Sequence, residues 1–164
     1  MIGAVNKDNN TPLHLAAQNG HTGIAELLLE KGALIGAIGY HSRTPLHFAT
    51  LGAHTGVVEL LLDKGALIGA ISESNNTPLH YAVLNGHTGI VELLLEKGAL
   101  VAAINESNNT PLHHAALKGY TGIVELLLKK GALIGAINKL NLTPLHVAAL
   151  MEHDDVVQLL KNRS

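Results

Sequence analysis

The sequence predicts an all-α fold, a solenoid of stacked helix-turn-helix units that carry β-hairpin or turn fingers. An internal repeat is the first observation, because the phrase TPLH recurs every 33 residues, starting at Thr11, Thr44, Thr77, Thr110 and Thr143. The second is that each repeat contains two apolar patterns at helical spacing, separated by glycines in the first four repeats. Helices of about ten residues are marginal alone, so we expect each unit to be stabilised by packing on its neighbours.

The two helices of a unit have recognisable ends. Thr11 is expected at the N-cap of the first helix, with Pro12 at the first helical position, where its missing N–H costs nothing. Gly20 is expected to end this helix in the left-handed conformation that glycine tolerates. Thr22 is expected to cap the second helix, and Gly32 to stop it.

These units resemble the ankyrin repeat, a 33-residue unit of a β-turn and two helices with the pattern T-P-L-H-x-A. The resemblance rests on segments such as TPLHLAAQNGHTGIAELLLEKGA and covers nearly the whole chain. It implies one domain over residues 1–164, with repeats at about 6–38, 39–71, 72–104, 105–137 and 138–164. Residues 1–5 match the tail of a preceding repeat, and the polar last unit is expected to act as a C-terminal cap.

Composition argues against several classes of partner. A formal charge of −2 gives no basic field for nucleic acid. The absence of cysteine excludes disulfides, thiol catalysis and cysteine-ligated zinc. No apolar run is long enough to span a membrane, and the N-terminus does not resemble a targeting segment. We therefore expect neither nucleic-acid binding nor membrane insertion, and an intracellular, cytoplasmic location.

Histidines are the first candidates for chemistry, because they recur in TPLH and again after the first helix. Metal binding or general-base catalysis is one hypothesis. Equivalent atoms of adjacent repeats lie roughly 8–10 Å apart, too far to share one zinc ion. We therefore expect each ring to bond loop backbone of its own or the neighbouring repeat. The sequence contains no convergent acid–base pair, nucleophile motif or phosphate loop, so we predict no catalytic residue, metal or cofactor.

His114 differs from the other histidines, because the equivalent positions hold Leu15, Phe48, Tyr81 and Val147. A ligand or a pH-sensitive contact is one interpretation of this residue. The alternative interpretation is that His114 has only a structural role, as a tolerated, partly buried ring with one hydrogen bond.

The segments after the second helices are unusually apolar. They read GALIGA or GALVAA where ankyrin repeats commonly read Gly-Ala-Asp-Val-Asn-Ala, so that leucine replaces Asp at Leu34, Leu67, Leu100 and Leu133. A column of isoleucines follows at Ile38, Ile71, Ile104 and Ile137, and a column of leucines ends the first helices at Leu51, Leu84, Leu117 and Leu150. The resemblance implies that both columns lie on the concave face formed by fingers and first helices, where ankyrin arrays bind partners.

Three interpretations of this apolar surface remain open at the level of sequence. The loop leucines could pack between neighbouring hairpins and extend the core, a partner protein could cover them, or the chain could self-associate through them. We predict a non-catalytic protein–protein interaction module of unknown partner, which uses both columns and Tyr40, His41 and Arg43 of the second finger. The alternative is a self-associating structural or designed scaffold without a natural partner, a homo-oligomer through the apolar face.

Overall fold

The computed structural model describes residues 2–163, and five helix pairs follow one another along this part of the chain. The first helices are α1 (Pro12–Gln18), α3 (Pro45–Leu51), α5 (Pro78–Leu84), α7 (Pro111–Lys118) and α9 (Pro144–Leu150). The second helices are α2 (Thr22–Glu30), α4 (Thr55–Asp63), α6 (Thr88–Glu96), α8 (Thr121–Lys129) and α10 (Asp154–Lys161). One 3-10 turn, η1 (Tyr40–Ser42), lies in a finger, and no strand occurs among the described residues. The all-α prediction is confirmed.

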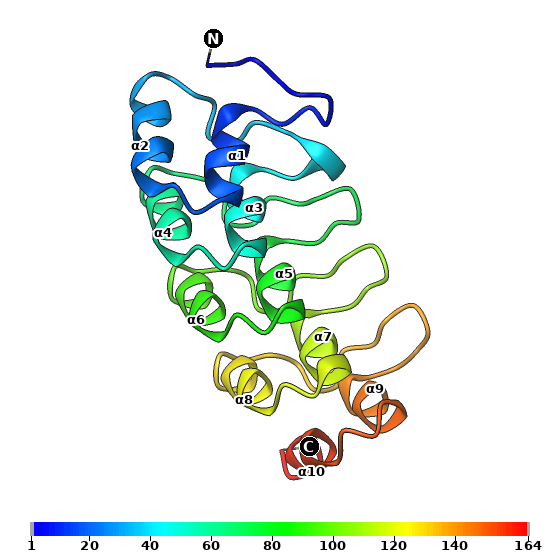
Figure 1. Ribbon diagram of the computed structural model, residues 1–164. Helices are drawn as coiled ribbons and strands as arrows, with labels where there is room; N and C mark the ends of the chain where they lie inside the picture. The colour runs from blue at the N-terminus through cyan, green and yellow to red at the C-terminus, as the bar shows by residue number, and fades with distance from the viewer. Residues whose placement is uncertain (1, 164) are drawn as a thin grey trace.

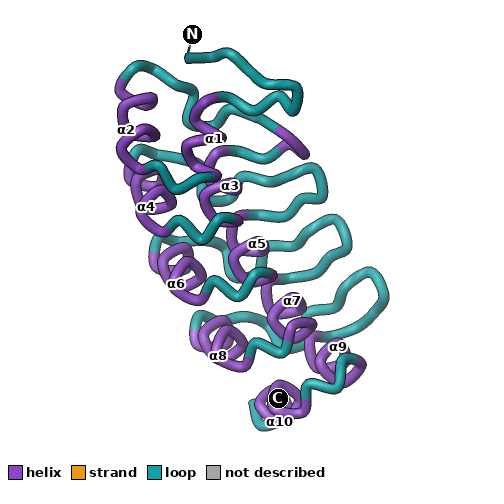
Figure 2. The backbone as a smooth tube through the Cα atoms, viewed as in Figure 1, coloured by secondary structure: helices purple, strands orange, loops and turns teal. Residues whose placement is uncertain are grey.

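The helix pairs stack into two layers. Figure 1 shows the first helices stacked along the middle of the molecule and the second helices along one side, with the fingers projecting from the other side. Each first helix contacts the first helix of the next pair, as in α1 with α3 and α5 with α7, and the second helices do the same. Figure 2 shows that each finger is a loop in every repeat, apart from the short turn η1. Contacts between neighbouring repeats therefore build the solenoid, as the sequence predicts.

A threonine and a histidine cap each first helix in the same way. Thr77 is the N-cap of α5, and its N–H donates to Nδ1 of His80 at 3.2 Å. The Thr77 hydroxyl in turn accepts from the backbone N–H of His80. The same reciprocal box forms at the other four first helices. Each histidine thus satisfies backbone groups that a helix start leaves without partners.

The same histidines join successive repeats. Nε2 of His14, His47, His80 and His113 lies 3.0–3.1 Å from a backbone carbonyl of the next repeat. A carbonyl only accepts and a backbone N–H only donates, so these rings carry their proton on Nε2 and leave Nδ1 as an acceptor. The expectation that the rings bond loop backbone is confirmed. Neutral imidazole is the form that fits these partners.

The start of the second helix differs from the sequence prediction. Helix α2 begins at Thr22 itself, and the residue at its N-cap is His21, whose side chain makes no capping hydrogen bond. The expectation that Thr22 caps this helix is therefore wrong. In three later repeats the equivalent histidine points back to the preceding repeat, where the Nε2 atoms of His54, His87 and His153 face carbonyls at 2.9, 3.4 and 3.1 Å. Contact between repeats takes the place of local capping here.

The fingers are held by Asn turns and by backbone bonds to one another. Asn105 and Asn138 each accept two backbone N–H groups of their own finger. Successive fingers bond where the N–H of Glu73, Glu106 and Lys139 donates to a carbonyl of the finger before. The residue two positions before the threonine of TPLH has φ between 56° and 62° in all five fingers. One of these residues is Ser42, although serine is a poor choice for the left-handed region. A positive φ therefore recurs at all five tips.

The core consists of small aliphatic side chains between the two helix layers. It includes Leu46, Leu79, Leu112 and Leu127, all nearly or fully buried. The first repeat is less covered than the others, because Ile24 and Leu27 on α2 are about half exposed while the equivalents of Ile24 at Val57 and Ile90 are buried. In those later repeats a preceding second helix supplies the cover.

Ala53 occupies a position that three other repeats give to glycine, and it has a φ of 58°. At the equivalent Gly20, an added Cβ would lie 2.5 Å from Nδ1 of His54. His87 in the next repeat corresponds to His54 beside Gly20. Its bond to the preceding repeat is the longest of the three, with 3.4 Å between Nε2 of His87 and the Leu51 carbonyl. The Ala53 methyl group accounts for this longer distance, because it occupies the space that glycine leaves open.

We expect Ala53→Gly to stabilise the protein by about 1 kcal/mol. The strain of alanine in the left-handed conformation, which glycine removes, is larger than the cost of the entropy that glycine adds to the unfolded chain. Urea unfolding of both proteins measures the change. Glu152→Gly is the matched control, since Glu152 has the same backbone conformation (φ 57°) in the last described repeat. If Ala53→Gly raises the free energy of unfolding no more than Glu152→Gly does, crowding of His87 by the Ala53 methyl group does not affect stability.

Candidate protein-binding surface

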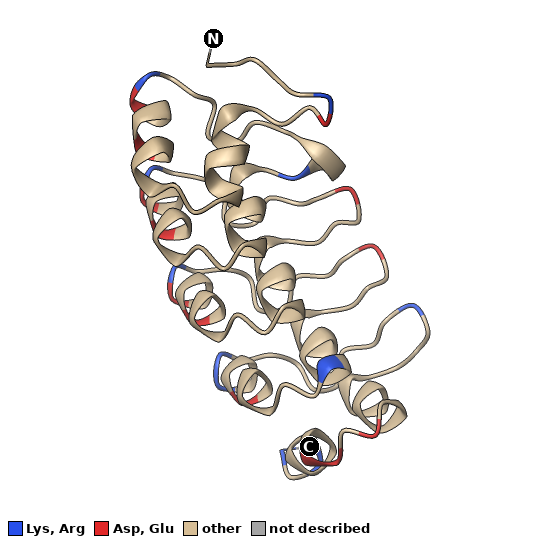
Figure 3. Ribbon diagram, in the orientation of Figure 1, with Lys and Arg blue, Asp and Glu red and all other residues tan. Residues whose placement is uncertain are grey.

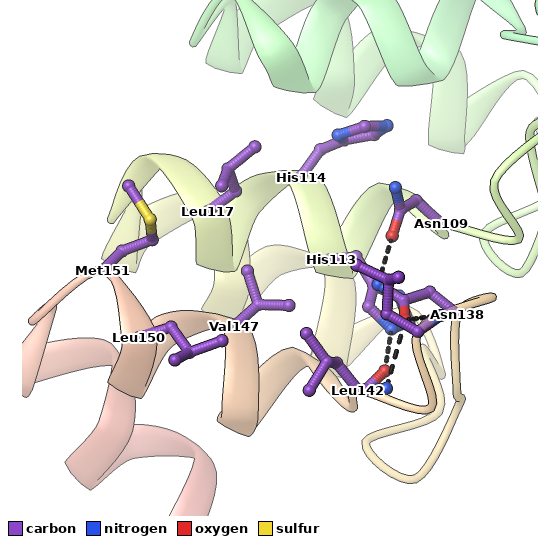
Figure 4. Close-up of a pocket in the computed structure, with 10 residues that line it drawn as sticks. Asn109, His113, His114, Leu117, Asn138, Leu142, Val147, Leu150 and Met151 are labelled. Atoms are coloured by element: carbon purple, nitrogen blue, oxygen red, sulfur yellow. Dashed lines mark hydrogen bonds between the residues drawn. The ribbon is translucent and has the colours of Figure 1, made fainter.

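A hollow of about 220 Å³ opens on the fourth and fifth repeats, between the first helices α7 and α9 and the finger that precedes α9. Figure 4 shows Asn109, Asn138 and Leu142 on the finger side of this hollow and Leu117, Leu150 and Met151 toward the C-terminal ends of the helices. Its lining consists of four polar and six apolar residues: Asn109, His113, His114, Asn138, Leu117, Leu140, Leu142, Val147, Leu150 and Met151.

The polar side of the hollow is a hydrogen-bonded network. Asn138 donates from Nδ2 to Oδ1 of Asn109 at 2.9 Å, and His113 faces the carbonyl of Leu142 at 3.0 Å. No described buried side-chain nitrogen or oxygen lacks a hydrogen-bond partner. These groups are therefore held rigidly before any ligand arrives, which suits recognition rather than proton transfer.

His114 contributes a buried ring to this network. Oδ1 of Asn105 accepts two backbone N–H groups, so Nδ2 of Asn105 is the donor to Nε2 of His114, at 3.3 Å. Burial, together with the smaller effect of nearby His80, His113 and Lys118, lowers the pKa of His114 to about 4. The ring packs edge-on against His80, with 5.6 Å between centroids. Phe48 packs in the same way on His14 and Tyr81 on His47, so His114 fills an aromatic packing position.

The apolar side of the hollow is open at its rim. Leu140 is 74% exposed, Leu150 69% and Met151 48%. Large apolar side chains that are exposed together around a hollow mark interaction surfaces in proteins. This arrangement can receive an apolar side chain of a partner.

Comparison with protein families covers the chain almost from end to end. The family described as ankyrin repeats (3 copies) matches residues 2–72, 33–105, 66–138 and 100–164. The chain is an ankyrin-repeat protein. Ankyrin repeats are generally protein-interaction modules and are typically not catalytic. A comparison with curated proteins gives no match.

Members of the two predicted columns of contact residues line different hollows of the ankyrin array. Leu117 and Leu150 line the hollow between α7 and α9, whereas Leu51 and Leu84 are partly buried at the same ends of α3 and α5. The isoleucines, which are 53–57% exposed, lie elsewhere. Ile71 and Ile104 line a second hollow of about 240 Å³ with Leu100, and the two hollows share no residue. The two hollows lie at different levels of the stack, one in the second and third repeats and the other in the fourth and fifth, so the placement of both columns on one concave face stays a prediction.

The loop leucines are exposed, which decides between the interpretations left open by the sequence. Leu34, Leu67, Leu100 and Leu133 are 64–77% exposed. They do not pack between neighbouring hairpins, so the interpretation that they extend the core is wrong. The core is extended instead by the next residue of each loop. These residues, Ile35, Ile68, Val101 and Ile134, are partly buried against the core.

The second finger uses its polar side chains within the array. Nδ1 of His41 lies 2.8 Å from a carboxylate oxygen of Glu73 in the next finger. Arg43 donates from Nε to the Tyr81 hydroxyl at 3.3 Å and places its guanidinium over the Tyr81 ring. Tyr40 stacks on His41 and remains about half exposed. Tyr40 and His41 remain accessible to a partner, whereas Arg43 is largely engaged with Tyr81.

Several lining residues of the C-terminal hollow were missed by sequence reasoning. Leu140 and Leu142 lie at finger positions that are polar in the second, third and fourth repeats, and Met151 follows the predicted Leu150. The signal was available, because a leucine that breaks a polar column of the repeat alignment is as informative as a column of leucines. Contact across the finger and two helices brings these three residues together.

The residues that line this hollow carry no Lys, Arg, Asp or Glu, although Lys118, Lys139 and Glu152 each adjoin a lining residue in the sequence. Figure 3 shows Lys, Arg, Asp and Glu on the second helices and at the finger tips, whereas Lys118 is the charged residue of the first helices. The described residues contain no cluster of three or more His, Asp or Glu side chains placed to hold a metal ion. Within residues 2–163 no helix has both the length and the apolar character needed to cross a bilayer.

Proposed function

We propose that this ankyrin-repeat array is a non-catalytic module that binds a partner protein on its concave face, with an apolar side chain of the partner in the hollow of the fourth and fifth repeats. The observation that carries the proposal is the open apolar rim of Leu140, Leu150 and Met151 beside a hydrogen-bonded polar floor. An apolar anchor with a polar edge is the usual anatomy of a protein-binding hot spot.

The size of the hollow favours a side chain of a protein over a whole small ligand. Its volume of about 220 Å³ is below the roughly 300–1,000 Å³ typical of small-molecule sites. The exposed Tyr40 and His41 lie on a finger nearer the N-terminus and supply a second contact point for an extended partner. Lys118 beside the hollow favours a partner segment that carries an acidic group close to its apolar anchor.

A library of displayed peptides, selected on the immobilised protein, tests this function. We expect enrichment of peptides with a leucine, methionine or phenylalanine anchor next to an acidic residue. Replacement of the rim by Leu140→Ser together with Leu150→Ser is expected to weaken the selected peptides about 10- to 100-fold, because an apolar anchor contributes about 1.5–3 kcal/mol. Isothermal titration calorimetry measures the change.

Leu100→Ser is the matched control, because Leu100 is as exposed as Leu150 and lines the other hollow. Binding of the selected peptides is expected to be unchanged in this variant. Equal binding by the rim variant and the unsubstituted protein, or equal loss in the control, would contradict the assignment of the site.

A further inference from the structure

A second apolar surface lies outside the proposed binding site. We define the apolar loop face as the four loop leucines, at positions 34, 67, 100 and 133, together with the four isoleucines at positions 38, 71, 104 and 137. Leu100 shares one hollow with Ile71 and Ile104, so the leucine and isoleucine rows belong to the same face. We infer that the apolar loop face pairs with the same face of a second copy of this chain, in an antiparallel two-fold dimer.

The exposed area of this face reaches the size of a specific dimer interface. The eight side chains are 53–77% exposed. Together they expose on the order of 500 Å² of apolar surface, at roughly 100 Å² for a whole aliphatic side chain. Two copies that cover each other thus bury about 1,000 Å², the lower limit for a specific interface, before the glycine and alanine backbone of the loops is counted.

The chemistry of the face suits an identical partner. The segments 33–38, 66–71, 99–104 and 132–137 contain only Ala, Leu, Ile, Val and Gly. No side chain in them repels its own copy or offers a hydrogen bond that could select a different protein. The four leucines also recur once per repeat, and a second copy of the chain presents a row with the same spacing. A self-complementary patch of this kind forms a closed two-fold contact.

Charges beside the leucines select the antiparallel arrangement. The residue pairs that end the second helices are Glu30–Lys31, Asp63–Lys64 and Glu96–Lys97, but the fourth pair is Lys129–Lys130. A two-fold axis that runs across the rows reverses the order of repeats and keeps leucines above leucines. The basic fourth pair of one copy then lies beside Glu30 of the other. Full overlap of the faces places Leu67 of one copy opposite Leu100 of the other.

Sedimentation velocity from about 1 to about 200 µM tests the dimer. We expect a species of twice the chain mass of 17.2 kDa. The double variant with Leu67→Ser and Leu100→Ser is expected to weaken the dimer by at least about 100-fold, because each substitution occurs twice in the interface. Both leucines are exposed, so circular dichroism is expected to show an unchanged fold.

A matched control separates this face from the other exposed apolar surface, at the start of the stack. Ile24→Ser together with Leu27→Ser changes two half-exposed residues on α2 and is expected to leave the dimer unchanged. Leu140→Ser with Leu150→Ser, the variant of the concave rim, is expected to do the same. Loss of the dimer in either control, with none in the loop variant, would overturn the inference without touching the proposed function.

Cross-linking tests the orientation, and the absence of native cysteine makes the result easy to interpret. A mixture of Leu67→Cys and Leu100→Cys chains is expected to give a cross-linked dimer with a short bismaleimide, and a mixture of Glu59→Cys and Glu92→Cys chains is not. A dimer that persists without the Leu67–Leu100 cross-link would overturn the antiparallel arrangement. A chain that stays monomeric at every concentration would overturn the dimer, whether it then binds phosphatidylcholine vesicles, which would assign the face to lipid, or does not.

Discussion

Lowering the pH from 7 to 5 is expected to reduce the free energy of unfolding by about 6 kcal/mol. Three buried rings account for this loss. Burial lowers the pKa values of His47, His80 and His114 to about 4, from an ordinary value of 6.5. Burial also lowers the pKa values of His14 and His113, which adds to the loss in the same direction.

The sign follows from which state binds the protons. Between pH 6.5 and pH 4 the unfolded chain protonates these histidines and the folded chain does not, so the folded state loses stability as the pH falls. Each ring contributes about 2 kcal/mol at pH 5 and about 3 kcal/mol near pH 4. The structural reason is the Nδ1 atom of His47 or His80, which accepts from a threonine N–H and has no room for a proton of its own.

Urea unfolding at several pH values between 7 and 5 measures this effect, in a range where most carboxylates remain ionised. The pH dependence is expected to correspond to at least about three protons taken up on unfolding at pH 5. His114→Phe is the matched variant, because Phe48 occupies the equivalent position in the second repeat and packs on His14 in the same geometry. This variant is expected to reduce the loss by about a third, and a stability that is constant from pH 7 to pH 5 would contradict the account.

Leu79→Ala is expected to destabilise the protein by about 3–5 kcal/mol. Leu79 is 1% exposed on α5, in the middle repeat. Its removal leaves a cavity between helices that contact both neighbouring repeats, and short helices that depend on such contacts cannot compensate. Urea unfolding again measures the loss.

Leu100→Ala is the control for this substitution, because it removes the same atoms from a leucine that is 69% exposed. At protein concentrations low enough for the monomer, its effect is expected to stay within about 0.5 kcal/mol. A loss from Leu100→Ala comparable with that from Leu79→Ala would show that the loop leucines contribute to the core of the monomer.

Much of the fold follows from local sequence, because its signals are short-range. Thr11 and Pro12 mark a helix start, and Gly20 and Gly32 mark helix ends, through backbone rules that act within one turn. The 33-residue period then requires stacking, since no helix of this length is stable alone. Thr22 was the exception, because the ring at the second helix start bonds the preceding repeat in His54 and its equivalents, a contact that a single unit does not reveal.

The binding surface was predictable only in part. Leu117 and Leu150 were predicted, and they line the concave hollow, because a variable column at the end of the first helix lies on one face in every repeat. The isoleucine column was predicted on the same face, which stays a prediction, and Ile71 and Ile104 line a hollow with Leu100 in the second and third repeats. Side-chain direction in an irregular loop depends on how the loop packs, and sequence spacing gives no rule for it comparable with the helical period.

The sequence by itself therefore determined the architecture, the family and the N-caps of the first helices, because those depend on period and on backbone preferences that each residue carries alone. The tertiary structure decided which apolar residues lie on the surface of the protein. Leu79 and Leu100 are the same amino acid, and Leu100 has the more apolar neighbours in the sequence, but Leu79 lies between two helix layers and Leu100 on a loop with no layer above it. Burial is a property of neighbours in space, so it was decided only when the repeats stacked.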